Sequence, residues 1–225
     1  MFQAKKHLIA PILVAFGFLV LALVVNFYAV TFATETASSS VTDVILSNTR
    51  VYDVDGIFVY GSVIFWVIVA GLCFVRPERL PFVLKSTALF IVIRSVFITL
   101  THIGPFPTHL IINPDNMWIG RAFGQDLFFV FFSGNDLFFS GHTGLPFLMA
   151  LLFWAKPFFR WLFTALALMF GVIVLAAHLH YTIDVLSAFF ITYAIYHIAR
   201  QVFVRDLALF ESKDNEPRAT GQLGA

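Results

Sequence analysis

Two short polar clusters in an otherwise apolar chain carry residue types suited to chemistry at phosphorus. The first cluster is DLFFSGHTG, residues 136–144, in which Ser140 and Gly141 precede an apolar run. A helix that begins there presents free backbone N–H groups and the positive end of its dipole, and both favour a phosphate group. His142 would then lie in the first turn of this helix, beside the anion. A capping serine with an incidental histidine is the simpler interpretation.

The second cluster is HLHYTID, residues 178–184, in which His180 and Asp184 are four residues apart. If this stretch is helical, the two side chains point the same way. The carboxylate can then accept a hydrogen bond from one imidazole nitrogen, so that the other nitrogen keeps its lone pair and can act as a nucleophile or base. A purely structural His–Asp pair is the alternative.

Together these residues predict a double displacement at phosphorus. His180, oriented by Asp184, would attack in line and form a phosphohistidine. Protonated His142 would donate to the leaving oxygen, and such general acid catalysis typically contributes about 10²–10⁴-fold. Backbone N–H groups and Arg94 would stabilise the phosphoryl oxygens. The chemistry needs no metal or other cofactor; a metal site built on Asp136 and Asp184 is the alternative.

The composition predicts an integral membrane protein. Of the 225 residues, 60% are hydrophobic and 12% are charged, whereas an ordinary soluble domain has about 45–50% and 25%. The formal net charge is only +1 and the sequence has no polybasic run, so no nucleic acid is expected as a partner. The single cysteine, Cys73, cannot form an internal disulfide or a zinc site built on paired cysteines.

The elements that must position the clusters are membrane-spanning helices, each of which needs about 20 mostly apolar residues. Six segments are expected to span, so the predicted fold is an all-α bundle of six transmembrane helices: 8–30, 57–75, 82–103, 141–155, 161–179 and 183–204. Residues 133–136 are expected to form a loop that dips toward the membrane. Residues 1–205 would then form one membrane domain, and the polar residues 206–225 a disordered cytoplasmic tail.

The distribution of Lys and Arg predicts the orientation of the spans. Basic residues precede the first span, follow the second, fourth and sixth, and are sparse in the other loops: Lys5, Lys6, Arg76, Arg79, Lys156, Arg160 and Arg205. Both termini are therefore expected in the cytoplasm. The fourth span then begins, and the fifth ends, at the opposite face. Both histidine clusters should meet on this periplasmic, extracellular or lumenal side.

Arg94 lies deep in the third expected span. It precedes Ile103 by nine residues, which places it about 13 Å below the outer end. A charge near a helix centre costs about 2.5–3.5 kcal/mol on insertion scales. Two interpretations follow: an ion pair with a carboxylate of another helix, or an anion clamp reached through a polar cavity. Lys85, near the cytoplasmic end of the same span, is expected to extend its charge to the interface.

These motifs resemble the type 2 phosphatidic acid phosphatase superfamily and, within it, the sphingomyelin synthase and ceramide phosphotransferase branch. The string DLFFSGHT, residues 136–143, is similar to the third motif of this branch, and AAHLHYTIDVLSAFF, residues 176–190, is similar to the fourth. Arg94 followed by Thr99, Pro105 and Pro107 resembles the second motif more loosely.

The resemblance implies a catalytic triad of His142, His180 and Asp184, with His180 as the nucleophile. It also implies site roles for Arg94 and Asp136, with Tyr181 as a neighbour that lines the pocket. Ser140 and Gly141, small residues that leave the backbone N–H groups approachable, are expected to bind the substrate as well. The implied reaction moves a phospho-head group from a glycerophospholipid to a lipid alcohol such as ceramide. Membrane lipids, including diacylglycerol, are thus the expected partners.

The departures from the branch concern the substrate more than the chemistry. The proline-rich first motif is missing, and Asn135 stands where the branch usually has glycine. Ile173 and Val174 replace the serine–arginine pair that precedes the nucleophile in ordinary superfamily phosphatases, which favours the synthase-like branch. The alternative function is a lipid phosphate phosphatase that hydrolyses phosphatidate or a related lipid phosphate. A transporter or scaffold is the other class of function. It would need carboxylates in mid-span, and the expected spans offer only Asp184, which lies at the outer edge of its span.

Overall fold

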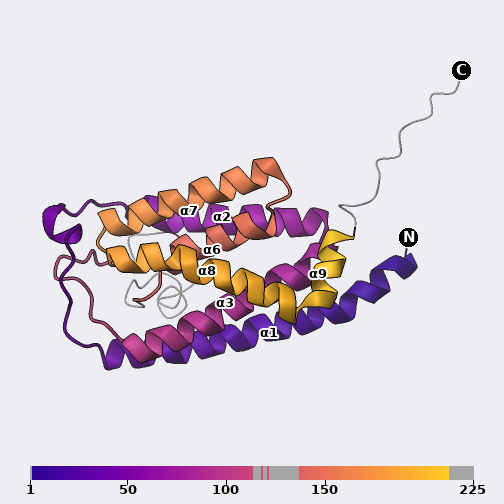
Figure 1. Ribbon diagram of the computed structural model, residues 1–225, viewed down its shortest axis with the longest axis horizontal. Coiled ribbons are helices and arrows are strands. Elements are labelled where there is room, and N and C mark those ends of the chain that lie inside the picture. Colours follow the sequence, from indigo (N-terminus) through magenta and orange to yellow (C-terminus); the bar gives the residue numbers. More distant parts are fainter. Residues whose placement is uncertain (1, 114–117, 119–120, 122–136, 213–225) are drawn as a thin grey trace, which may run out of the picture.

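The computed structural model describes residues 2–113, 118, 121 and 137–212. Over this part of the chain the fold is all-helical, with seven α-helices, two short 3-10 helices and no strand (Figure 1). The α-helices are α1 (Phe2–Glu35), α2 (Asp55–Val75), α3 (Leu80–Thr101), α6 (Gly141–Leu152), α7 (Pro157–Ala176), α8 (Thr182–Val202) and α9 (Val204–Glu211). The predicted loop at 133–136, with Asp136, lies outside the described residues.

Helix starts follow from local chemistry. Pro157 is the first residue of α7, and Pro81 lies in the first turn of α3. Proline suits these positions because the first N–H groups of a helix have no partner within it. Ser140 is the N-cap of α6, and its side chain accepts a hydrogen bond from the Thr143 N–H at 3.4 Å. Such a cap satisfies one of the free N–H groups and fixes where α6 begins.

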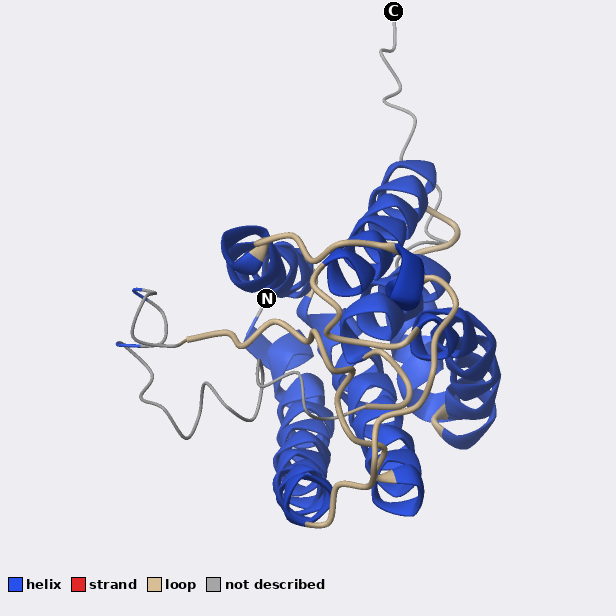
Figure 2. Ribbon diagram, turned by 90° about the vertical axis from the view of Figure 1, so that its left-hand side faces the viewer, coloured by secondary structure: helices blue, strands red, loops and turns tan. Residues whose placement is uncertain are grey.

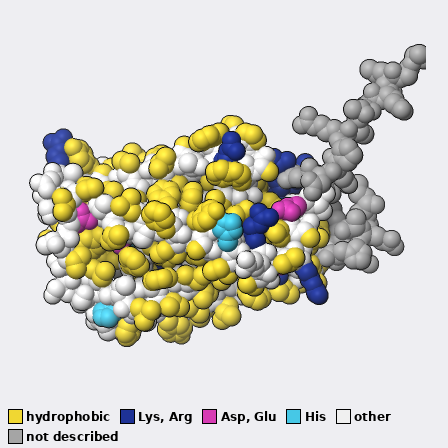
Figure 3. Space-filling view, viewed as in Figure 1, with side chains coloured by type: hydrophobic (Ala, Val, Ile, Leu, Met, Phe, Trp, Pro, Cys, Tyr) yellow, Lys and Arg dark blue, Asp and Glu magenta, His cyan; other side chains and the backbone are white. Residues whose placement is uncertain are grey.

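Five of the described helices are long and apolar enough to cross a membrane, so the chain is a multi-pass membrane protein. They are α1, α2, α3 with the turn before it, α7 and α8. Figure 3 shows hydrophobic side chains along the whole visible face, whereas Lys and Arg gather toward the end that carries the termini. Large apolar side chains such as Phe74 and Phe190 are 88% and 78% exposed, as expected of a surface that faces lipid.

The fourth expected span, 141–155, is instead a short central helix. α6 has 12 residues and is therefore about 18 Å long, less than the hydrocarbon thickness of about 30 Å. It packs against α2, α3, α7 and α8 in the middle of the bundle (Figure 1), and most of its residues are buried. Apolar composition alone suits lipid and a protein core equally, but a helix of this length is typical of a core, and α6 packs in the core. The count of six spans stays a prediction.

The chain continues as a helix where a disordered tail was expected from residue 206. α9 folds back against α3, and Asp206 accepts a hydrogen bond from Lys85 Nζ at 2.6 Å in a pair that is mostly buried. The Phe210 ring packs against Phe82 and Phe153. This ion pair and ring packing hold α9 in place, and Lys85 is thus paired within the protein instead of reaching to the interface. Residues 213–225 lie outside the described residues.

One end of the bundle carries the connections that matter for the site. The start of α1 and helix α9 lie at one end, and the α7–α8 junction lies at the other (Figure 1). Figure 2 looks onto this second end, where loops cross the helix ends. The loops that meet there are the α1–α2 connection, residues 36–54, and the segment after α3, residues 102–113.

Candidate active site

The His–Asp pair expected from spacing is present at the start of α8. Nδ1 of His180 lies 3.3 Å from Oδ2 of Asp184, and the two residues are only 2% and 0% exposed. His180 precedes α8, so a shared helical face does not bring them together. Asp184 instead reaches back from the first turn, where the same Oδ2 accepts the Tyr181 N–H at 2.9 Å. With Nδ1 turned to the carboxylate, Nε2 is the nitrogen that can attack.

The other carboxylate oxygen of Asp184, Oδ1, is a buried acceptor that has no hydrogen-bond partner within the described part of the chain. A buried acceptor that lacks a partner is costly. The charge of this carboxylate is therefore only partly satisfied, and a positive charge that develops on His180 would be stabilised beside it.

The first cluster meets the second through a backbone hydrogen bond. The Ser140 N–H, just before α6, donates to the Asp184 carbonyl at 3.1 Å. Arg94 comes to the same place from α3, since its Nε donates to the Phe139 carbonyl at 2.7 Å. A Cβ added to Gly141, the first residue of α6, would lie 3.3 Å from that Nε. A guanidinium and a helix N-terminus thus converge beside the His–Asp pair, an arrangement that favours an anion.

His142 lies in the first turn of α6 and is partly buried. Its ring packs against Phe58 of α2, with 4.2 Å between ring centroids, and lies 6.2 Å from the Phe170 ring of α7. The helix start that positions His142 is the one that contacts Asp184. Its role as general acid stays a prediction, and Asp136 lies outside the described residues.

The turn between α7 and α8 ends α7 in a Schellman motif. The His178 N–H donates to the Leu175 carbonyl at 3.0 Å, and the Leu179 N–H donates to the Val174 carbonyl at 2.8 Å. His178 has a φ of 53°, the left-handed conformation that usually requires glycine at this position. For a residue with a Cβ, the left-handed conformation costs about 1–2 kcal/mol of conformational free energy. The motif sets the direction of the chain two residues before His180.

His178 is an anchor for loops 36–54 and 102–113. Its Nδ1 lies 2.6 Å from Thr108 Oγ1, and its Nε2 lies 3.3 Å from Thr49 Oγ1. Burial lowers the pKa of His178, an effect that the charge of Asp43 opposes. A neutral imidazole between two hydroxyl groups has both nitrogens in use. This histidine therefore joins two loops to the α7 end and leaves nucleophilic chemistry to His180.

Tyr181 and Thr182 fix these two loops to the start of α8. The Tyr181 hydroxyl donates to the Gly104 carbonyl at 2.8 Å and accepts from the Val41 N–H at 3.2 Å. Tyr181, which was expected to line the pocket, thus has its hydroxyl engaged by both loops. The Thr182 N–H and hydroxyl donate to the Asp43 carboxylate at 2.7 and 2.9 Å. Asp43 thereby caps α8 from a distant loop, a contact that no local sequence pattern indicates.

Replacement of Asp43 by asparagine is expected to destabilise the protein by about 1–3 kcal/mol, because charge-assisted hydrogen bonds are lost at the N-terminus of α8. Burial opposes ionisation, but the bonds from Thr182, Leu46 and Ile45 prevail and lower the pKa of Asp43. A carboxylate with a lowered pKa stabilises the fold above its unfolded-state value of about 3.9 and loses this effect as pH falls through its folded-state pKa.

Thermal unfolding midpoints in detergent, measured from pH 7 to pH 3, test this expectation. The difference between wild type and Asp43→Asn should be largest at pH 7 and should shrink below about pH 4. Asp53→Asn, an exposed change of the same type on the same loop, is the control. Equal midpoints for Asp43→Asn and wild type at pH 7 would contradict the capping role.

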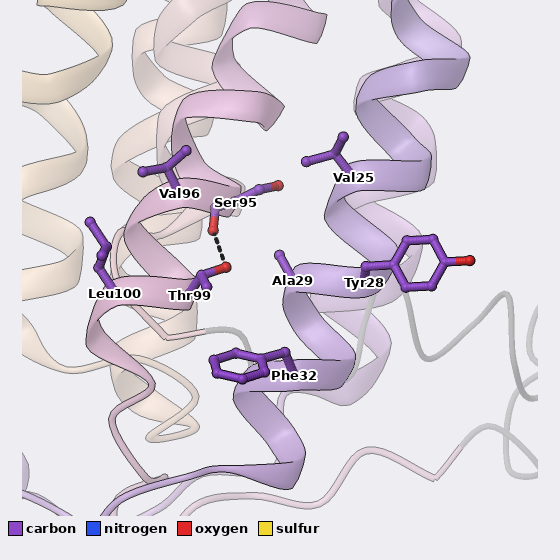
Figure 4. Close-up of a pocket in the computed structure, with 8 residues that line it drawn as sticks. All are labelled: Val25, Tyr28, Ala29, Phe32, Ser95, Val96, Thr99 and Leu100. Carbon is purple, nitrogen blue, oxygen red and sulfur yellow. Dashed lines mark hydrogen bonds between the residues drawn. The ribbon is translucent and has the colours of Figure 1, made fainter.

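The apolar grooves of the surface lie apart from the His–Asp pair. A groove of about 460 Å³ separates α1 from α3 (Figure 4) and is lined by Val25, Tyr28, Ala29, Phe32, Ser95, Val96, Thr99 and Leu100. The hydroxyl groups of Ser95 and Thr99 are satisfied within α3: Thr99 Oγ1 donates to the Ser95 carbonyl, and Ser95 Oγ donates to the Ile91 carbonyl. The groove offers a surface to lipid and no acid, base or nucleophile beyond the Tyr28 phenol.

In the part of the chain that the structure describes, no three His, Cys, Asp or Glu side chains gather closely enough to hold a metal ion. The groups available for chemistry there are the imidazoles, the Asp184 carboxylate, the Arg94 guanidinium and the start of α6.

Comparison with known families matches residues 133–201 to the family described as PAP2 superfamily C-terminal. No curated protein and no solved structure matches the chain. The matched segment covers less than half of the chain, but it runs from just before α6 into α8 and so contains His142, His180 and Asp184. This similarity supports the PAP2 superfamily, a group of phosphatases and phosphotransferases, as the family of this chain.

Proposed function

We propose that this protein is a lipid phosphotransferase that moves a phospho-head group from a glycerophospholipid to a lipid alcohol such as ceramide. The observation that carries the proposal is the contact between the starts of α6 and α8, where the Ser140 N–H donates to the Asp184 carbonyl. It brings a buried His–Asp pair next to a helix N-terminus that the Arg94 guanidinium also faces. Phosphoryl transfer through a phosphohistidine needs these two elements, a nucleophile and an anion site.

The proposed reaction has two steps. First, the Nε2 lone pair of His180 forms a bond to phosphorus as the bond from phosphorus to the glycerol oxygen breaks. Protonated His142 gives its proton to that oxygen, and diacylglycerol leaves. Second, the acceptor hydroxyl attacks the phosphohistidine, His142 takes the hydroxyl proton, and the nitrogen–phosphorus bond breaks. Asp184 stabilises the charge on the His180 ring, and Arg94 with the α6 N–H groups stabilises the phosphoryl oxygens.

Burial of the pair supports transfer over hydrolysis. His180 and Asp184 are almost fully shielded, and a dry site disfavours water as the acceptor. An apolar groove of about 370 Å³ between α3 and α8 includes Phe97. The Phe97 ring lies 5.7 and 6.0 Å from the rings of Phe138 and Phe139, just before α6. Such a groove gives acyl chains an apolar path from the membrane toward the start of α6.

Product analysis tests the proposal. Purified protein is incubated in detergent–lipid micelles that contain fluorescent ceramide, phosphatidylcholine, phosphatidylethanolamine and phosphatidate, with His180→Ala protein as the blank. We expect a fluorescent phospho-ceramide and an equal amount of diacylglycerol from the wild type only. The head group on the product identifies the donor lipid.

Two results would overturn the proposed transfer. Diacylglycerol with free phosphate and untouched ceramide would make the protein a phosphatidate hydrolase with the same residues. No product from any of the lipids, with wild-type protein that is folded by thermal unfolding, would reject lipid phosphotransfer between these donors and ceramide.

A further inference from the structure

His178 lies where two loops hold the end of α7, and the proposed mechanism gives it no part. Each loop contributes one threonine hydroxyl to its ring. Thr49 of loop 36–54 has its Oγ1 3.3 Å from Nε2, and Thr108 of loop 102–113 has its Oγ1 2.6 Å from Nδ1. The residue is only 2% exposed, so the imidazole is buried and held on both sides.

The same two loops also bond the last carbonyl groups of α7, which lack partners within the helix. The Tyr52 N–H donates to the Ala176 carbonyl at 2.9 Å, and the Leu110 N–H donates to the Ala177 carbonyl at 3.1 Å. Each donor follows the threonine of its loop by two or three residues. Each loop therefore makes a pair of contacts, one with the His178 ring and one with the main chain just before it.

The residue held in this way has an unfavourable backbone conformation. His178 has a φ of 53° at a position where helices usually end with glycine. A non-glycine residue keeps such a conformation only when its surroundings fix it. On the far side of the turn, the Val174 carbonyl accepts from the Leu179 N–H at 2.8 Å and from the His180 N–H at 3.4 Å. The turn thus fixes where the main chain of His180 lies and where its ring stands relative to Asp184.

We propose that His178 is a positioning residue, which fixes the left-handed turn and so places Nδ1 of His180 against Asp184. The inference rests on the proposed function, in which His180 is the nucleophile. The distance of 3.3 Å from Nδ1 to Oδ2 is at the long end of hydrogen bonds, so a small rotation of the ring would break the contact. Attack on phosphorus would then be slower, because a shift of about 1 Å can cost about 10²-fold in rate.

Thr108 makes the shorter ring contact and provides the first test. Thr108→Val removes the hydroxyl and keeps the branched shape, whereas Thr108→Ser keeps the hydroxyl. We expect kcat to fall about 10-fold for Thr108→Val, with KM within about 2-fold of wild type, and Thr108→Ser to keep most of the rate. The control is Thr101→Val, which removes a hydroxyl that bonds the Phe97 carbonyl of its own helix at 2.8 Å.

The outcome for Thr108 separates positioning from stability. The Thr108 residue is exposed as a whole, so its replacement should cost little folded protein. A role in stability alone would lower the amount of folded protein and leave kcat per folded molecule unchanged. A wild-type kcat for Thr108→Val, or an equal loss for Thr108→Ser, would overturn the proposal.

Two replacements of His178 provide the second test. Asparagine adopts the left-handed conformation more readily than other non-glycine residues, and its amide can take the place of Nδ1 beside Thr108. Leucine offers neither property. We expect kcat to fall about 10²-fold for His178→Leu and less than about 5-fold for His178→Asn. Equal rates for the two variants would contradict the positioning role.

The two tests are joined in a double variant. In the His178→Leu background Thr108 has lost its ring partner, so Thr108→Val should change kcat by less than about 2-fold there. The same 10-fold loss in both backgrounds would show that Thr108 acts by another route and would overturn the proposal.

Hydrogen exchange provides a readout that needs no substrate. The amides of residues 178, 179 and 180 donate to carbonyl groups at the end of α7, so their exchange reports on the turn. Thr108→Val should speed exchange of a peptide that covers 177–181 several-fold, whereas Thr108→Ser and Thr101→Val should not. If the wild type proves to have no phosphotransferase activity, the proposed function fails while this measurement still decides whether the loop holds the turn. Unchanged exchange in Thr108→Val would reject that hold.

Discussion

His180→Gln is expected to lower turnover by about 10³-fold or more, because the change removes the nucleophile and the nitrogen that carries the covalent intermediate. The fold should tolerate it, since the Asp184 carboxylate keeps its bond from the Tyr181 N–H. Initial rates in micelles and the thermal unfolding midpoint measure the two effects separately. His197→Gln is the matched control: His197 is an exposed histidine within α8, and its ring packs against the rings of Tyr193 and Tyr196.

The same variant decides whether the intermediate is covalent. Acid-labile, base-stable label should appear on the peptide that contains residue 180 when wild-type protein is quenched during turnover of a donor lipid labelled in its phosphate. His180→Gln protein should carry none. Turnover that persists in His180→Gln, or label that remains on its other histidines, would show that the nucleophile is a different residue.

The long helices could be predicted from the sequence because length and apolar composition determine them. The expected spans 57–75, 82–103, 161–179 and 183–204 differ from α2, α3, α7 and α8 by at most four residues at either end. Among these four helices the largest differences fall at α7, where Pro157 begins the helix early and the left-handed His178 ends it before residue 179. Because apolar residues continue past the end of α7, hydropathy alone does not indicate where such a turn ends the helix. The first expected span, 8–30, differs more, because α1 begins six residues earlier and ends five residues later.

Elements held by distant contacts were not predictable in the same way. α9 depends on the pair between Lys85 and Asp206, which are 121 positions apart. α6 is short because it is packed within the bundle, and its apolar run alone is compatible with a span or with a core helix. Hydropathy describes one segment at a time, whereas these outcomes depend on which segments meet.

In the candidate site, too, the residues of the local motifs could be predicted, whereas the residues that contact them from distant loops could not. The motifs pointed to His180, Asp184, Ser140 and Arg94, and the structure brings these four to one place. The residues that hold the α7–α8 turn and the start of α8 in place lie in loops 36–54 and 102–113. The composition of these loops does not indicate which of their residues make contacts. Asp43, Thr49 and Thr108 each contact a residue that is 70 or more positions away in the sequence. A search for polar loop residues could have included them, but nothing local would have distinguished them from other polar loop residues.

Arg94→Gln is expected to lower kcat about 10²–10³-fold, the usual effect of removing one group that stabilises charge in a transition state. Arg94 is 6% exposed, and its Nε supports the Phe139 carbonyl just before α6. The change therefore also removes a structural hydrogen bond, and the unfolding midpoint must be measured beside the rate. Arg94→Lys keeps the charge but cannot reproduce the planar set of donors, so it should restore only part of the activity. Arg200→Gln, which removes an exposed cation of α8, is the control for net charge.

Gly141→Ala separates the position of the guanidinium from its charge. The added Cβ would lie 3.3 Å from Nε and 3.5 Å from Cζ of Arg94, so the guanidinium must move by a few tenths of an ångström while its charge remains. If Arg94 acts on the phosphoryl group, this displacement should cost about 10-fold in kcat, less than the loss of the charge but more than a change of helix propensity would cause. If Arg94 only supports the fold, Gly141→Ala should leave kcat unchanged, and the loss in Arg94→Gln should follow the loss of folded protein. The rank order of kcat, with wild type above Gly141→Ala and Gly141→Ala above Arg94→Gln at equal folded concentration, thus distinguishes an anion clamp from a structural arginine.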